Sequence, residues 1–228
     1  MLSLGQGYAG VIGCWLESFV QSRFCNPLLH LPLHACNIAP IHSPKMTADS
    51  NSMIARMLPR PMPRVCVAVT ASDPAELIEK ADALIRDNTF IEFRLDYLSK
   101  PPLALPKIKR FADYHPHIVS IATCRRAANG GKFKGSIPAQ LDLLCKAAAA
   151  GCQLVDLELQ SAARCKPEQL RKLRNQAALI LSSHDFRATK KLEETFDQMS
   201  TYQADFYKIV TTATTLYDNV AMMKFLEK

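Results

Sequence analysis

The chain has 228 residues, of which 48% are apolar, 21% are charged and 7% are aromatic, and its formal net charge is +7. The basic residues are scattered rather than gathered in a tract, which predicts attraction for small anions and argues against a nucleic-acid-binding protein. No apolar run approaches the ~18–20 residues that a membrane span requires, so we expect no membrane association. The eight cysteines form neither a C-x-x-C pair nor a zinc-finger pattern and are typical of a reducing, cytoplasmic location.

The first 62 residues differ from the rest. They hold the only tryptophan and three of the six histidines, and they show no clear periodicity. Their start lacks the positive region of a secretory signal, and arginine is too sparse for a typical mitochondrial presequence. We predict that residues 1–62 are a disordered tail or translated sequence upstream of the natural start, with a functional N-terminal arm as the alternative. The ordered domain is predicted to span residues 63–228.

From residue 64 onward, short apolar runs alternate with segments of helical periodicity. Asp73 is a candidate N-cap with Pro74 at the first helical position, and Gly151 is a candidate terminator of a later helix. We expect strands at 64–72, 90–98, 117–125, 153–159, 178–186 and 205–213. We expect helices at 73–88, 104–114, 137–151, 167–176, 190–202 and 216–228. Six βα units predict an α/β fold with parallel strands.

The positions of the polar residues favour a barrel over an open doubly wound sheet. No G-x-G-x-x-G or Walker-type loop follows any expected strand, which weakens the nucleotide-binding version of the open sheet. In a (β/α)₈ barrel, polar side chains late in the strands converge on the interior or the C-terminal rim, where such enzymes place their chemistry. The residues in such positions are Glu92, Arg94, Asp96, Arg125, Asp156, Glu158, His184 and Lys208.

Lys208 lies in the middle of an apolar run, where an ammonium group is costly to bury without a partner. One explanation is structural: the lysine pairs with a buried carboxylate such as Asp156 or Glu158. The other is catalytic. Near cationic side chains on neighbouring strands the ammonium form is disfavoured, so more neutral amine is available to form a Schiff base with a ketone.

Side chains on the neighbouring strands fit this chemistry. His184 supplies a base that titrates near neutrality, although a lone strand histidine is also a common hydrogen-bonded core residue. Arg94 and Arg125 are suited to donate to an anionic, hydroxylated substrate, and Glu92 is suited to accept from its hydroxyls. For Arg94, a structural pair with Glu92 or Asp156 is the alternative.

Five segments resemble type I 3-dehydroquinate dehydratase of the shikimate pathway, and they occur in order on successive strands. They are EFRLD, TCRRAANGGKFKG, VDLEL, SSHDF and DFYKIV. Each segment is weakly diagnostic alone, but the five in register are specific, and the resemblance covers residues 64–228. It implies a (β/α)₈ barrel that is usually a homodimer and needs no metal or organic cofactor.

By this resemblance, Lys208 forms an imine with the C3 ketone of 3-dehydroquinate. His184 assists imine formation, takes the C2 proton and then protonates the departing C1 hydroxyl. Glu92, Arg94 and Arg125 fall at substrate-binding positions. The product is 3-dehydroshikimate plus water.

The chain departs from the family pattern at two points. The family usually has an acidic residue before the GG of the third-strand loop, where it orients the catalytic histidine, and this chain has Asn129. We expect a modest shift in the His184 pKa from this change, and we assign supporting roles to Asn129, Asp156 and Glu158.

The second departure is length, because the family barrel has eight βα units and this chain has six. A truncated barrel predicts two unpaired sheet edges, low stability and little activity. In some relatives a shikimate dehydrogenase domain follows the dehydratase, so such a fused domain beyond Lys228 is a candidate partner.

Two rival functions stay open. A class I aldolase on the same barrel shares the lysine but does not need the EFRLD and SSHDF segments in this arrangement. A non-catalytic remnant would bind a ligand or a partner chain without turnover.

Overall fold

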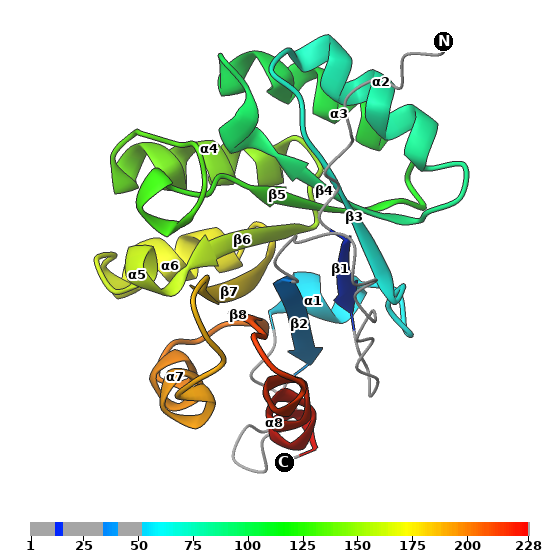
Figure 1. Ribbon diagram of the computed structural model, residues 1–228. Helices are drawn as coiled ribbons and strands as arrows, with labels where there is room; N and C mark the ends of the chain where they lie inside the picture. The colour runs from blue at the N-terminus through cyan, green and yellow to red at the C-terminus, as the bar shows by residue number, and fades with distance from the viewer. Residues whose placement is uncertain (1–11, 16–33, 41–51, 228) are drawn as a thin grey trace, which may run out of the picture.

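The computed structural model describes residues 12–15, 34–40 and 52–227 and contains the six strand–helix units expected from the sequence (Figure 1). The strands of these units are β3 (Val65–Val69), β4 (Phe90–Arg94), β5 (Val119–Thr123), β6 (Leu154–Glu158), β7 (Ala178–Asp185) and β8 (Phe206–Thr212). Their main helices are α2 (Pro74–Leu84), α3 (Leu105–Tyr114), α4 (Ile137–Ala149), α6 (Pro167–Arg174), α7 (Leu192–Ser200) and α8 (Leu216–Leu226). The shorter helices are α1 (Met53–Met57), α5 (Leu159–Ala162), η2 (Leu95–Tyr97), η3 (Pro101–Ala104) and η4 (Ala127–Asn129).

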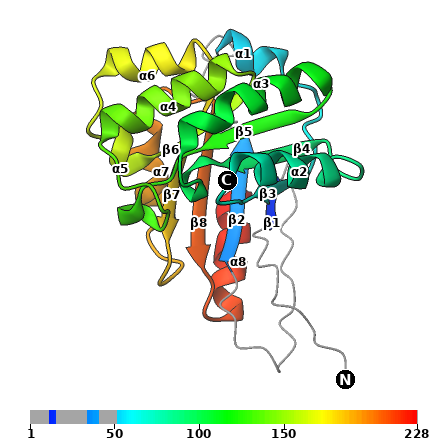
Figure 2. The same cartoon turned by 90° about the horizontal axis from the view of Figure 1, so that it is seen from above.

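Strands β3 to β8 lie side by side in chain order, and each pairs in parallel with the next. The sheet curls, and the main helices cover its outer side (Figures 1 and 2). The predicted incomplete (β/α)₈ barrel with six βα units is therefore confirmed. One boundary was wrong: the strand expected over 90–98 ends at Arg94, and the chain then turns through η2.

Two further strands lie in the N-terminal part of the chain, β1 (Ile12–Trp15) and β2 (His34–Pro40). They pair in parallel with each other, β1 pairs antiparallel with β3, and β2 pairs antiparallel with β8, so the described strands form a closed barrel. The expectation of two unpaired edges is therefore wrong, because the backbone groups of β3 and β8 find partners in β1 and β2. Most of residues 1–62 lies outside the described residues, and their assignment as a separate extension stays a prediction.

The helix ends follow the signals in the sequence. Asp73 caps α2, because its Oδ1 accepts hydrogen bonds from the backbone N–H groups of Ala75 at 2.7 Å and Glu76 at 3.3 Å. Gly151 follows α4 with φ of +105°, a left-handed conformation that favours glycine, and an added Cβ would lie 2.7 Å from Ala112 Cβ. Asp73 therefore marks the start of α2, and Gly151 marks the end of α4.

The buried residues form two apolar clusters. The larger one lies between the sheet and the helices and includes Leu77, Phe93, Ile108, Leu144 and Leu179. The smaller one, which we call the barrel floor, consists of Ala55, Leu58, Cys66, Phe90, Val119, Ile121, Leu154, Ala178 and Ile180. The floor fills the interior at the N-terminal ends of the parallel strands, and α1 closes it from below.

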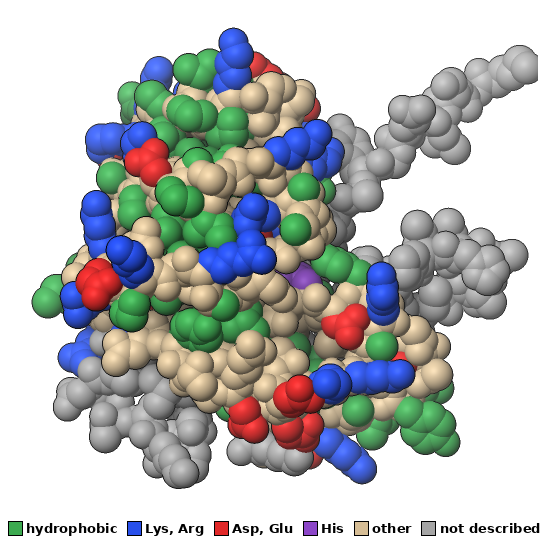
Figure 3. Space-filling model, turned by 90° about the vertical axis from the view of Figure 1, so that its left-hand side faces the viewer, with side chains coloured by type: hydrophobic (Ala, Val, Ile, Leu, Met, Phe, Trp, Pro, Cys, Tyr) green, Lys and Arg blue, Asp and Glu red, His purple; other side chains and the backbone are tan. Residues whose placement is uncertain are grey.

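The surface carries scattered charge. In Figure 3, lysine and arginine side chains are interspersed with apolar and acidic ones over the face that includes α4 and α5, as expected from their distribution in the sequence. Within the part of the chain that the structure describes, no helix is both long and apolar enough to cross a membrane.

Candidate active site

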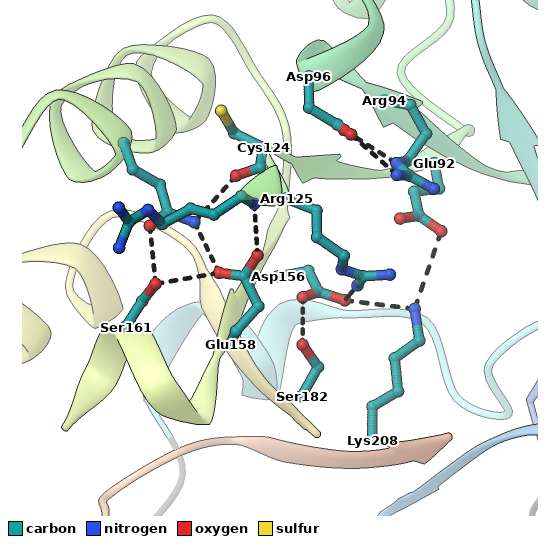
Figure 4. A network of polar contacts seen from close by, with 12 residues as sticks. Glu92, Arg94, Asp96, Cys124, Arg125, Asp156, Glu158, Ser161, Ser182 and Lys208 are labelled. Atoms are coloured by element: carbon teal, nitrogen blue, oxygen red, sulfur yellow. Dashed lines mark hydrogen bonds and ion pairs between the residues drawn. The ribbon is translucent and has the colours of Figure 1, made fainter. Parts of the chain in front are cut away.

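Four of the polar side chains predicted from the sequence meet in the barrel interior: Glu92, Arg125, Asp156 and Lys208 (Figure 4). Alternate residues of a strand share a face, so the positions two and four residues after a floor residue also point inward. Glu92 follows Phe90 on β4, Asp156 follows Leu154 on β6, and Ser182 and His184 follow Ile180 on β7. Lys208 faces them from β8, where it pairs in register with Ser182.

Asp156 lies at the centre of this cluster and is 2% exposed. Its Oδ2 accepts hydrogen bonds from Arg125 Nη2 at 3.1 Å and from Lys208 Nζ at 3.2 Å, and its Oδ1 accepts one from Ser182 Oγ at 2.6 Å. Burial alone would raise the pKa of Asp156, but the charges of Arg125 and Lys208 outweigh burial and hold the pKa below its ordinary value. Asp156 is therefore ionised at neutral pH.

Lys208 has carboxylates on two sides. Its Nζ lies 3.2 Å from Asp156 Oδ2 and 3.9 Å from Glu92 Oε2, and the residue is 4% exposed. Of the two structural partners predicted for this lysine, it reaches Asp156, while the Glu158 carboxylate bonds elsewhere. Burial would raise the pKa of Glu92, but Lys208 and then Arg94 lower it below its ordinary value.

His184 lies further along β7, nearer the rim. Its ring stacks on Phe186 with 5.8 Å between ring centroids and 20° between planes. The pKa of His184 is held well below its ordinary value, first by burial and then by the positive charges of Arg125 and Lys208, while Asp156 opposes them. The imidazole is therefore neutral at pH 7, the form that can accept a proton. Its Nε2 is buried and has no hydrogen-bond partner among the described residues.

Two arginines border the cluster. Arg94 donates to both oxygens of Asp96, from Nε at 3.0 Å and from Nη2 at 2.9 Å, so the predicted alternative pairing of Arg94 with Glu92 or Asp156 is wrong. The pairing follows from the end of β4 at Arg94, because η2 then turns Asp96 back toward the guanidinium. Arg125 is 7% exposed, and its Nε has no hydrogen-bond partner among the residues that the structure describes.

Comparison with known proteins gives the family of the chain. The family model described as type I 3-dehydroquinase matches residues 65–228. The chain belongs to the type I 3-dehydroquinase family.

Relatives in sequence and in structure agree. The chain is 35% identical over 172 residues to the 3-dehydroquinate dehydratase of Dehalococcoides mccartyi (strain ATCC BAA-2100 / JCM 16839 / KCTC 5957 / BAV1), a match covering 73% of this chain and 71% of that protein. It is 34% identical over 177 residues to the enzyme of Desulfotalea psychrophila (strain LSv54 / DSM 12343), with 72% and 71% covered. The crystal structure of the 3-dehydroquinate dehydratase from Aquifex aeolicus VF5 has a similar fold, with a TM-score of 0.54, 21% identity, and 71% of this chain and 72% of that chain covered.

Two residues with predicted supporting roles lie apart from the centre of the candidate site. Glu158 accepts from the backbone N–H of Arg126 at 2.8 Å and from Gln140 Nε2 at 2.7 Å, and it thereby ties the end of β6 to the turn after β5. Asn129 ends η4, and its backbone N–H donates to Arg126 O at 2.9 Å. Within the described ranges, the Asn129 side chain makes no hydrogen bond to His184. The ring of Phe186 packs against Gly130, next to Asn129, where an added Cβ would lie 2.5 Å from the ring.

Sequence reasoning missed several members of the candidate site. Ser182 was not assigned a role, although its position two residues before His184 places both on one strand face. Asp96 was placed on the face of Arg94 but not recognised as its partner. Gln140 and Ser161 hold Glu158 from α4 and α5, and nothing in the sequence links these distant positions.

No group of three or more His, Cys, Asp or Glu residues within the described ranges is arranged to hold a metal ion.

Proposed function

We propose that this chain dehydrates 3-dehydroquinate to 3-dehydroshikimate through a Schiff base on Lys208, with His184 as the acid and base. Membership of the type I 3-dehydroquinase family supports the reaction. The observation that carries the residue roles is the meeting of Lys208, Asp156 and a neutral His184 inside one barrel, each on its own strand.

In this mechanism the Lys208 amine attacks the C3 ketone and water leaves, which forms the protonated imine. The imine draws electrons from C2, and neutral His184 takes the C2 proton to leave an enamine. The electron pair of the enamine then expels the C1 hydroxyl, which His184 protonates as it departs. Water hydrolyses the new imine, so the lysine is regenerated and one water is released overall.

The surrounding charges suit a carboxylated, hydroxylated substrate. Arg125 Nε is enclosed without a hydrogen-bond partner in the described parts of the chain, so it is available to a substrate oxygen. Glu92 Oε1 is likewise unpaired there and can accept from a substrate hydroxyl. Arg94 is held by Asp96 through Nε and Nη2, which leaves Nη1 outside that pair to donate to a substrate oxygen.

Borohydride trapping tests the proposal. Incubation with 3-dehydroquinate and sodium borohydride is expected to give a mass adduct on Lys208, accompanied by a rise in enone absorbance when borohydride is left out. Lys208→Ala should abolish both signals. The matched control Lys191→Ala, at a side chain that is 72% exposed, should leave both unchanged. An adduct on Lys208 only with sugar phosphates would favour the class I aldolase, and binding of 3-dehydroquinate without adduct or enone would favour the non-catalytic remnant.

The oligomeric state, the cellular location and a fused domain remain predictions from the sequence. Light scattering tests the expected homodimer, and cell fractionation tests the cytoplasmic location. The nucleotide sequence after codon 228 tests whether a shikimate dehydrogenase domain is encoded beyond Lys228.

A further inference from the structure

Ser182 is a fully buried polar residue in the middle of the reactive cluster. It lies on β7 between Glu158 of β6 and Lys208 of β8, with which it is in register. Its hydroxyl donates to Asp156 Oδ1 at 2.6 Å. A hydroxyl–carboxylate hydrogen bond of this length is in the range of strong, charge-assisted bonds.

The two carboxylate oxygens of Asp156 have different hydrogen-bond donors. Oδ1 faces Ser182, and Oδ2 faces both Arg125 and Lys208. The terminal torsion of an aspartate is broad, so the carboxylate plane is set by its partners rather than by its own preference. Ser182 is the donor that fixes the edge opposite to the lysine.

We propose that Ser182 is a positioning residue for the dehydration: it orients Asp156 and draws negative charge toward Oδ1, so that Lys208 is held in place without being locked in its ammonium form. This inference rests on the proposed function of Lys208. Without the hydroxyl, more charge resides on Oδ2, which favours the protonated amine. The neutral amine then appears at higher pH, and imine formation at pH 7 is slower.

The charged and titratable groups around this pair come from β4, from β7 and from the end of β5, and they include Arg94, which acts on Glu92 and His184. Arg125 competes with Lys208 for Oδ2, Glu92 lies on the other side of the lysine, and His184 lies above it on β7. Substitution of Ser182 changes none of these charges. The expected effect is therefore a displacement of the pH dependence rather than a loss of one of its limbs.

The test compares Ser182→Ala with Ser183→Ala. Ser183 is the matched control, because its side chain points to the opposite face of β7 and makes no hydrogen bond among the described residues. The rate of borohydride-trapped imine formation is measured from pH 6 to pH 10 for each variant and for the parent chain. For Ser182→Ala we expect a rate about tenfold lower at pH 7, recovery toward the parent rate as the pH rises, and little change in KM. Ser183→Ala should follow the parent curve.

A second readout does not depend on turnover. Titration of the Lys208 side chain by NMR with labelled lysine should show loss of its proton at higher pH in Ser182→Ala than in the parent. If the parent chain forms no imine with 3-dehydroquinate, the proposed function fails, and the NMR titration still decides the role of Ser182. Superimposable titrations and pH–rate curves for parent and Ser182→Ala would overturn the inference.

A purely structural role for Ser182 predicts a different outcome. It would lower the free energy of unfolding without displacing the pH dependence of the folded enzyme. Ser182→Cys keeps the volume of the side chain but has only a weak donor, so it should reproduce the pH displacement of Ser182→Ala. Loss of folding in both variants, with Ser183→Ala intact, would also count against a positioning role.

Discussion

The barrel interior contains two layers that are built on the same strands and differ completely in chemistry. In the floor, β4, β6 and β7 contribute Phe90, Leu154 and Ile180, which are fully buried and apolar. Two residues further along, the same strands contribute Glu92, Asp156 and Ser182. Because strand side chains alternate, one step of two residues separates an apolar layer that stabilises the fold from the polar layer of the candidate site.

The difference shows how a small barrel can hold several charges in its interior. Apolar contacts in the floor keep water away from one side of the cluster, which strengthens every electrostatic interaction above it. Above the floor, the Asp156 carboxylate is balanced by hydrogen bonds from Arg125, Ser182 and Lys208. The apolar floor could not bind a polar substrate, and the polar layer could not supply the apolar packing of the floor.

Placing a charge in the floor should have the largest effect. Ile180→Asp would bury a carboxylate with no cationic partner, at a cost of about 4 kcal/mol or more in the free energy of unfolding. Urea unfolding followed by circular dichroism measures this cost. The control Ile180→Val should cost about 1 kcal/mol. An Ile180→Asp variant with the same free energy of unfolding as the parent chain would show that water reaches the floor.

Acid should weaken the upper layer first. The pKa of Asp156 and Glu92 is lowered in the folded chain, so the stability that they contribute is present above their ordinary range near pH 4 and is lost as the pH falls through it. His184 adds to the loss below about pH 6.5, because the unfolded chain binds a proton that the folded chain excludes. Urea midpoints measured from pH 7 to pH 3 should fall below about pH 6.5, first through His184 and then, near pH 4 and below, through the two carboxylates. In His184→Gln the decline between pH 6.5 and pH 5 should be flatter, and an unchanged slope there would contradict the assignment.

Opening the cover of His184 should change activity more than stability. Burial is the largest cause of the lowered His184 pKa, and Phe186 stacks on the ring. Phe186→Ala should therefore raise the His184 pKa toward its ordinary value and move the acid limb of the kcat/KM profile to higher pH by about one unit. Phe186→Leu, which keeps an apolar cover, should move the limb less. Identical pH profiles of kcat/KM for Phe186→Ala and the parent would show that other groups exclude water from the imidazole.

The smallest effect is expected at Asn129. Its side chain makes no hydrogen bond to His184 within the described ranges, and Phe186 packs against the neighbouring Gly130. Asn129→Glu adds a negative charge near the imidazole and should raise the His184 pKa by less than about one unit. A pH–rate profile identical to that of the parent would contradict even this modest effect.

Much of this architecture was predictable from periodicity. The alternation of strands and helices gave the order of the six units, and Asp73 and Gly151 marked helix ends correctly. The polar residues late in the strands pointed to the interior for a simple reason: a period of two carries the side-chain face from the buried run to the reactive position. The inward positions of His184 and Lys208 were therefore predicted before their neighbours were known.

The features that could not be predicted from the sequence depend on changes of chain direction and on long-range contacts. The pairing of Arg94 with Asp96 needs the turn at η2, which the continuous strand pattern hides. Pairing of β2 with β8 joins segments far apart in the sequence, and no local pattern announces it. Helix α1 was assigned to the extension because five residues show too little periodicity to be recognised as a helix.

Asp205 has a practical consequence for anyone who trims this chain for crystallisation. Its Oδ1 accepts from the Ser52 backbone N–H at 2.7 Å and from Arg174 Nη2 at 2.8 Å, and its Oδ2 accepts from the Leu179 N–H at 2.9 Å. A cut at residue 64, just before the family match, would remove one of these donors together with the apolar cover of Ala55 and Leu58. The shortened protein would expose apolar surface at its base and invite aggregation, and it would also lose β1 and β2, the strand partners of β3 and β8.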